Sequence, residues 1–169
     1  YSNRFAPSPR RVRMYAAEKG IALEIIEIDI AAGANLAPEY LVINPLAETP
    51  TLERDDGTRL TESLAICRWL EEEHPEPDLF GRTARERAEI NRWIDRLMFH
   101  VYVPTAEAFR NTHRYWAGRV KQVPEWGELQ RAAVLAEYDA LDAWLAGRDY
   151  VASERFSMAD IIAFTTVDF

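Results

Sequence analysis

The chain contains one cysteine, Cys67, and three histidines among its 169 residues. A single cysteine excludes an internal disulfide and a thiolate-rich metal site, and it fits a reducing compartment. We therefore expect a cytoplasmic protein that needs no metal.

Long apolar runs are absent as well. No segment approaches the ~20 apolar residues that a bilayer span requires, and residues 1–4 do not read as the start of a signal peptide, so we expect no membrane association.

Basic residues are outnumbered by acidic ones, 20 to 28, which gives a net charge of −8. Nucleic acid is not expected as the main partner, because phosphate binding needs a basic face. The composition, 48% hydrophobic and 28% charged, is that of a globular protein.

An initiator methionine is also lacking, and the apolar run 161–164 resembles a helix that has just begun when the chain ends at Phe169. We expect residues to be missing at both ends.

The first half of the chain alternates between helical and extended patterns, as an α/β domain does. Its expected elements are a helix over 9–20, a β-branched strand over 23–30, a loop, a hairpin with strands at 51–54 and 59–61, and a helix over 62–73. The segment His74-Pro75-Glu76-Pro77 then breaks the chain, since two prolines so close together cannot continue a helix.

Beyond this break the pattern is helical throughout. Amphipathic segments run from residue 85 to 99 and beyond, and from 129 to 145. Ser157 and Asp160 stand three apart before an apolar run, which resembles a capping box with Asp in place of Glu or Gln. We therefore divide the chain into a first domain, 1–74, a linker, 75–83, and an all-helical domain, 84–169.

Thr49-Pro50 is the first candidate for a binding site, because the proline comes immediately before an expected strand. A cis bond there would turn the preceding peptide outward, so that Thr49 offers its N–H and C=O to an extended ligand. The alternative is an ordinary trans proline that opens a strand.

Glu62 and Ser63 form the second candidate, at the start of an expected helix. Backbone N–H groups and the Ser63 hydroxyl would receive a carboxylate, while Glu62 would hold an ammonium group. Together they suit the head group of an α-amino acid. The alternative is helix capping, with Thr61 as the cap and Glu62 complementing the helix dipole.

Ser8 is the third candidate, at the start of the first expected helix. A hydroxyl at a helix N-terminus can donate a hydrogen bond to a thiolate and so lower the pKa of the thiol. Arg10, Arg11 and Arg13 crowd the same helix start, where cations are unfavourable; a nearby anion or a solvated basic face would explain them. The alternative for Ser8 is an N-cap.

Cys67, by contrast, falls among apolar residues and is expected to be a buried, inert thiol.

These three sites, in this order, resemble the N-terminal domain of cytosolic glutathione transferases. The likeness rests on Asn-Pro-Leu-Ala-Glu-Thr-Pro-Thr-Leu at 44–52 and Thr-Glu-Ser-Leu-Ala-Ile at 61–66, while 157–160 resembles the capping segment of the family's helical domain. The family pattern is roughly Asn-Pro-x-Gly-x-Val-Pro-x-Leu, so Ala47 and Glu48 depart from it. The resemblance implies a thioredoxin-like α/β N-terminal domain followed by an all-α C-terminal domain.

By this resemblance, Glu62 and Ser63 bind the γ-glutamyl end of glutathione. Thr49, held by a cis bond to Pro50, pairs through its backbone with the cysteinyl part. The family also implies glutathione as co-substrate, no metal, and a homodimer.

The catalytic group implied by the resemblance is Ser8, which falls near the cysteine of beta-class and other cysteine-type members. Ala6 stands where some serine-type members have their serine, and Tyr1 stands near the catalytic residue of the tyrosine type. The segment from Arg11 to Ile21 also resembles the zeta class, although its Ser-Ser-Cys signature is missing.

The second substrate would meet the helical domain. Phe99, His100, Tyr102 and Val103 are expected to line a site for a small hydrophobic electrophile, with ordinary helix packing as the alternative. The expected function is activation of the glutathione thiol for conjugation to that electrophile. The alternatives are a non-catalytic binding protein of the same fold, a zeta-like glutathione-dependent isomerase, and a thiol–disulfide reductase, which would need a cysteine where this chain has Ser8.

Overall fold

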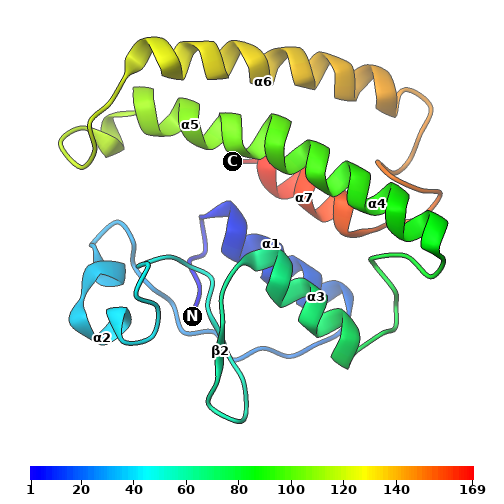
Figure 1. Ribbon diagram of the computed structural model, residues 1–169, viewed down its shortest axis with the longest axis horizontal. Coiled ribbons are helices and arrows are strands. Elements are labelled where there is room, and N and C mark those ends of the chain that lie inside the picture. Colours follow the sequence, from blue (N-terminus) through cyan, green and yellow to red (C-terminus); the bar gives the residue numbers. More distant parts are fainter. The chain divides into compact units, whose positions relative to one another are not determined.

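The computed structural model describes residues 1–169 and divides into two compact units (Figure 1). The first comprises 1–80 with 167–169, and the second comprises 81–166. The expected linker, 75–83, spans this division. None of the helices has the length and apolar character needed to cross a bilayer.

The first unit holds a small sheet with helices packed against it. Its elements are α1 (Pro7–Glu18), the 3₁₀ turn η1 (Ala34–Leu36), α2 (Pro38–Leu41), β1 (Leu52–Glu53), β2 (Arg59–Leu60) and α3 (Ser63–Glu73). β1 and β2 are antiparallel, with Leu52 opposite Leu60. The predicted hairpin is therefore confirmed, with its turn at Asp55-Asp56-Gly57.

Residues 1 and 2 pair with chain segments on two sides, outside the two-stranded β1–β2 sheet. Tyr1 and Thr51 exchange both backbone hydrogen bonds, 2.9 and 3.1 Å, which is the pattern of an antiparallel pair. On its other side Ser2 forms a parallel bridge with Glu27. The strand predicted over 23–30 is thus reduced to this one bridge, with hydrogen bonds from the Ser2 N–H to Ile26 (2.9 Å) and from the Ile28 N–H to Ser2 (2.7 Å).

The first helix begins at Pro7, two residues earlier than predicted, and ends at Glu18. Ala6 is its N-cap, so the interpretation of Ser8 as an N-cap is wrong: Ser8 lies inside the first turn. Pro7 suits the first helical position because its missing N–H would have no helical acceptor there. The chain entering the helix is held instead by Asn3, whose side-chain oxygen accepts the N–H groups of Phe5 and Ala6, both at 3.0 Å.

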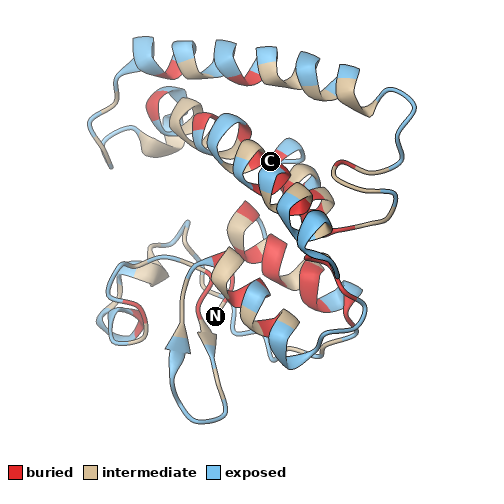
Figure 2. Ribbon diagram, turned by 45° about the vertical axis from the view of Figure 1, so that its right-hand side comes forward, coloured by how far each residue is buried: buried red, intermediate tan, exposed pale blue.

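α1 and α3 pack side by side and form the core of the first unit. Within the first unit, Figure 2 shows buried residues concentrated on these two helices. Tyr15, Ile66, Cys67 and Leu70 are all essentially inaccessible to solvent. Their burial explains why both helices form in this chain, since an amphipathic face needs a packing partner more than it needs helix propensity.

The segment after α3 is attached to α1 by a cluster of buried polar groups that we call the Glu71 cluster. The Glu71 carboxylate forms an ion pair with Lys19 at 2.7 Å and accepts the hydroxyl of Tyr15. It also accepts the N–H groups of Leu79 and Phe80, at 3.0 and 3.3 Å. Lys19 in turn donates to two carbonyl groups of the same segment, those of residues 74 and 77. These bonds explain why residues 75–80 belong to the first unit.

The second unit is helical, as predicted. Its elements are α4 (Ala84–Arg96), a π-helical stretch η2 (Leu97–Tyr102), α5 (Val103–Thr112), the 3₁₀ turn η3 (Arg114–Trp116), α6 (Pro124–Leu145) and α7 (Met158–Val167). α4, η2 and α5 follow one another without a break. α6 begins five residues before the predicted 129, with Pro124 in its first turn.

α6 lies along α5, and a glycine allows their close approach. A Cβ built on Gly127 would stand 2.5 Å from the Thr112 side chain. Towards its other end, α6 contacts α4 through Trp93 and Trp144, whose ring centroids are 4.9 Å apart. An ion pair of 2.9 Å between Arg96 and Glu137 adds a third contact.

Half of the predicted capping box is present at the start of α7: the Asp160 carboxylate accepts from Ser157, but the Ser157 hydroxyl donates to Asp160 and does not accept its backbone N–H. One Asp160 oxygen accepts both the N–H and the hydroxyl of Ser157, each at 2.8 Å. The other oxygen accepts the N–H of Val151 at 2.8 Å. Asp160 therefore joins the helix start to the preceding loop.

Candidate functional site

The start of α3 presents two groups that an amino acid head group could bind. Glu62 is the N-cap, exposed, with φ 64° and ψ 113°, and its carboxylate makes no interaction within the chain. The carboxylate is therefore available to an external cation. Thr61, the alternative cap, does not occupy that position.

Ser63 is the first residue of α3 and is only 7% exposed. Its Oγ accepts a hydrogen bond from Nη1 of Arg11 at 2.9 Å, and this is the one interaction of its side chain. A hydroxyl has one hydrogen to donate as well as lone pairs to accept. The Ser63 hydrogen thus remains for an acceptor outside the chain, at a helix N-terminus that favours negative charge.

The loop that precedes β1 is fixed by its own side chains. Buried Asn44 donates to the carbonyl of Glu48 at 2.8 Å, and the Tyr40 hydroxyl donates to the same carbonyl at 2.6 Å. Burial, the dominant effect, raises the pKa of Tyr40, so this hydroxyl stays protonated and can donate. The bond between Thr49 and Pro50 is cis, as the resemblance implied.

Thr49 is the residue of this loop whose backbone groups are open, meaning that they have no hydrogen-bond partner within the chain. Neither its N–H nor its C=O forms a hydrogen bond within the chain. If the β1–β2 register is continued by two residues, Pro50 falls opposite Glu62, and Thr49 and Ser63 are the next residues along the two segments. The open backbone of Thr49 and the open side chains of α3 therefore lie at the same end of the hairpin.

Ala47 adopts φ 58°, the left-handed region that favours glycine. This conformation explains the glycine in the family pattern at this position. In this chain an alanine adopts the same left-handed conformation. A hydrogen bond from the Ala47 N–H to the Asn44 carbonyl, 2.9 Å long, stabilises it.

Ser8, the predicted catalytic residue, lies half-buried in the first turn of α1. Since Pro7 and Pro9 have no N–H, Ser8 supplies the only backbone donor among the first three residues of the helix. Tyr1 is placed differently. Its hydroxyl donates to Glu53 at 3.4 Å and its ring stands edge-on to Tyr40, so in this structure it points to the hairpin.

Cys67 is buried in α3, one turn beyond Ser63. Burial raises the pKa of its thiol to about 12, although the charges of Arg11 and Arg68 act in the opposite direction. A thiol with such a pKa is not a nucleophile near neutral pH. Cys67 therefore belongs to the core and not to the site.

The residues predicted to meet the electrophile lie on η2 and at the first position of α5, in the second unit. Phe99 is 66% exposed and Val103 is 43% exposed, whereas Leu97 and Val101 between and beside them are buried. His100 is exposed and Tyr102 is half-buried. A π-helical stretch of this kind is rare and often marks a functional position, because it changes which side chains share one face.

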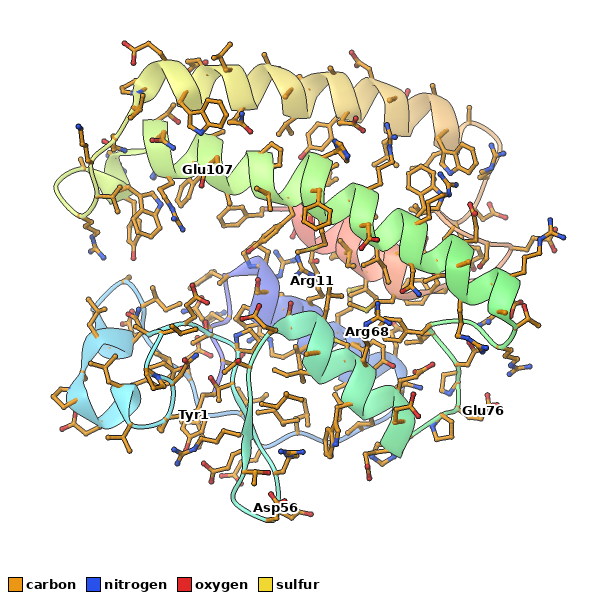
Figure 3. The ribbon with its side chains drawn as sticks, viewed as in Figure 1. Tyr1, Arg11, Asp56, Arg68, Glu76 and Glu107 are labelled. Atoms are coloured by element: carbon orange, nitrogen blue, oxygen red, sulfur yellow. The ribbon has the colours of Figure 1, made fainter.

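Arg11 is the residue that sequence reasoning did not connect with Ser63. It is completely buried, and Figure 3 labels it where α1 meets the first turn of α3. The only signal in the sequence was the unusual crowding of cations at the start of α1. The structure separates them: Arg10 forms an ion pair with Asp168, Arg13 donates to the carbonyl of Arg4 at 2.8 Å, and Arg11 turns inward.

Comparison with known proteins identifies the fold and the family. Residues 5–73 match the glutathione S-transferase N-terminal domain, and residues 127–169 match the glutathione S-transferase C-terminal domain. Glutathione S-transferase 2 of Saccharomyces cerevisiae is 33% identical over 165 residues, covering 95% of this chain and 71% of the yeast protein.

Solved structures agree with these matches. The crystal structure of Gtt2 from Saccharomyces cerevisiae superposes with a TM-score of 0.91 at 32% identity, covering 99% of this chain and 82% of that one. A glutathione S-transferase domain-containing protein of Marinobacter aquaeolei has the same TM-score at 29% identity, covering 99% and 84%. The fold is thus a thioredoxin-like domain followed by an all-helical one, and the chain belongs to the glutathione transferase family.

Proposed function

We propose that the protein is a glutathione transferase that binds glutathione at the start of α3 and activates its thiol for attack on a hydrophobic electrophile. The observation that carries the proposal is the set of open groups in the first unit: the Glu62 carboxylate, the Ser63 hydroxyl hydrogen, and the N–H and C=O of Thr49. Each has the chemistry needed by one part of glutathione.

The γ-glutamyl end supplies both charges of an α-amino acid. Its ammonium group pairs with Glu62, and its carboxylate accepts from Ser63 at the positive end of α3. The cysteinyl part is extended, so its backbone pairs with Thr49 beside Pro50 in the way that an added strand pairs with a sheet edge. Binding of this kind orients the thiol before reaction.

Ser8 is the proposed stabiliser of the thiolate, with its hydroxyl in the first turn of α1. If it donates to the sulfur, Ser8→Ala leaves glutathione affinity nearly intact but raises the pKa of the bound thiol. Conjugation then slows by about one to three powers of ten, the range found for single groups that stabilise a developing charge. Ser8→Thr, which keeps a hydroxyl, is the control.

Phe99, His100, Tyr102 and Val103 are the proposed contacts of the electrophile. Phe99 and Val103 expose apolar surface beside exposed His100 and half-buried Tyr102, which suits a small hydrophobic substrate. No metal or further cofactor is needed for thiol addition. The single buried cysteine supports a cytosolic location.

We propose a homodimer as the working form. α6 has 22 residues, of which only Gly127 and Val134 are buried, while Trp126, Leu129 and Leu135 are 45–64% exposed. Apolar exposure of this extent is typical of a surface that a second copy covers. A light-scattering mass equal to that of one chain would contradict the dimer.

Glutathione binding is tested by calorimetry on Glu62→Ala. Loss of a charge-assisted hydrogen bond commonly weakens binding by about 1.5–3 kcal/mol, so affinity should fall by roughly ten-fold or more. Glu72→Ala is the matched control, since Glu72 is an exposed glutamate on the same helix. Equal affinity of Glu62→Ala and the unmodified protein would place the head group elsewhere.

A further inference from the structure

Arg11 is a charged residue with no exposed surface, and no step of the proposed function uses it directly. Its guanidinium reaches from α1 to the first residue of α3, with Nη1 2.9 Å from the Ser63 Oγ. A buried guanidinium is costly to desolvate, and here it stands beside a helix N-terminus, which is itself positive. The N-cap of that helix is Glu62, whose carboxylate the proposed function pairs with the ammonium group of glutathione.

The hydrogen bond also fixes what Ser63 can do. Because Arg11 donates to the hydroxyl oxygen, Ser63 is held as an acceptor on that side and its own hydrogen must point elsewhere. No group of the chain accepts that hydrogen. A neighbouring guanidinium further polarises the O–H bond, and donors of that kind bind anions more strongly than a free hydroxyl does.

We infer that Arg11 is a positioning residue for the glutathione site: it acts through Ser63, orienting the hydroxyl and adding positive potential for the γ-glutamyl carboxylate. The inference rests on the proposed function and extends it to a residue that does not touch the ligand. It assigns Arg11 to recognition of one carboxylate, not to the thiol and not to the electrophile.

Arg11→Lys tests this role, because lysine keeps the charge but lacks the rigid planar group that reaches Ser63. We expect the glutathione Kd to rise about ten-fold, with KM for glutathione rising in parallel and kcat nearly unchanged. Arg13→Lys, two residues along α1 and bonded only to a backbone carbonyl, should bind glutathione like the unmodified protein.

A double-mutant cycle with Ser63→Ala shows whether Arg11 acts through Ser63. Ser63→Ala alone should also weaken binding about ten-fold, and adding Arg11→Lys should weaken it by no more than about two-fold further. Full additivity of the two losses would overturn the inference, and so would an Arg11→Lys protein that binds glutathione normally.

A ligand that lacks the γ-glutamyl carboxylate, 4-aminobutanoyl-cysteinyl-glycine, identifies the group that Arg11 serves. Arg11→Lys should not change its affinity. If Arg11→Lys does not fold, side-chain NMR of the unmodified protein decides: glutathione should shift the Arg11 guanidinium signals and the decarboxylated peptide should not. Identical shifts with both ligands would refute the role. Absence of any glutathione binding by the unmodified protein would instead refute the proposed function itself.

Discussion

At the scale of single residues, the proposed binding groups differ from their neighbours in having polar groups without a hydrogen-bond partner inside the chain. Buried Asn44 and Tyr40 both donate to the carbonyl of Glu48, and Asn44 also donates to the Thr51 hydroxyl. Thr49, by contrast, has neither its N–H nor its C=O bonded within the chain. Thr49 is half-buried, so its open N–H and C=O are accessible, and the proposed function assigns the cysteinyl part of glutathione to them. It likewise assigns the γ-glutamyl carboxylate to the Ser63 hydrogen.

Cys67 provides a test of burial at the residue scale. Its folded pKa of about 12 lies above the ordinary thiol value, so the stability that comes from burying the neutral thiol is complete below about pH 9 and is lost as the pH rises towards 12. At pH 8 the thiolate is about a 10⁻⁴ fraction. Native protein should therefore react very slowly with a chromogenic thiol reagent, and urea-unfolded protein should react rapidly with one equivalent. Fast labelling of native protein would contradict the buried assignment.

Ala47 provides a second test, of backbone conformation. An L-residue in the left-handed region is destabilised by about 1–2 kcal/mol, which glycine avoids, while the freer unfolded chain offsets up to about 1 kcal/mol of that gain. Ala47→Gly should therefore leave the free energy of unfolding unchanged or raise it by up to about 2 kcal/mol. Ala132→Gly, exposed in the middle of α6, should lower it by about 0.5–1 kcal/mol. Urea denaturation of both variants gives the comparison; equal losses would contradict the account of Ala47.

At the scale of elements, the spacing of apolar residues predicted where most helices lie. It did not predict the polar contacts at their ends. The sequence pattern was sufficient for α3, α4 and the hairpin because each has an apolar face or a turn of defined type. It misjudged the start of α1, where two prolines and Ala6 replace the expected serine cap. It also could not reveal the contact between Arg11 and Ser63, since these residues are 52 positions apart and only the packing of α1 against α3 brings them together.

The Glu71 cluster should dominate the stability of the segment after α3. Glu71→Ala leaves Lys19, whose side chain is 0% exposed, with no carboxylate partner, and it removes the acceptor of two backbone N–H groups. Breaking a buried pair in this way commonly costs about 3–5 kcal/mol. Glu72→Ala, at an exposed neighbouring position, should change the free energy of unfolding by less than about 0.5 kcal/mol. Similar urea midpoints for the two variants would show that the cluster contributes little.

At the scale of the whole molecule, the proposed contacts of glutathione and those of the electrophile come from different units. The thioredoxin-like unit supplies polar groups at the end of a hairpin and at a helix start, which were predicted from a recognisable order of short motifs. The helical unit supplies apolar exposure on η2, which sequence periodicity indicates only loosely because a π-helical stretch departs from the 3.6-residue repeat. The proposed glutathione contacts therefore follow from the sequence more directly than the proposed electrophile contacts do.

The central claim is that this chain both binds glutathione and activates its thiol. The most direct measurement is the rate at which a generic aromatic electrophile is conjugated to glutathione, followed by the absorbance of the thioether, with and without the protein. We expect a rate that is proportional to protein concentration and saturates with glutathione. It should fall when Glu62→Ala is tested at low glutathione concentration. A rate no greater than that of the mixture without protein would contradict the claim, even if glutathione binds.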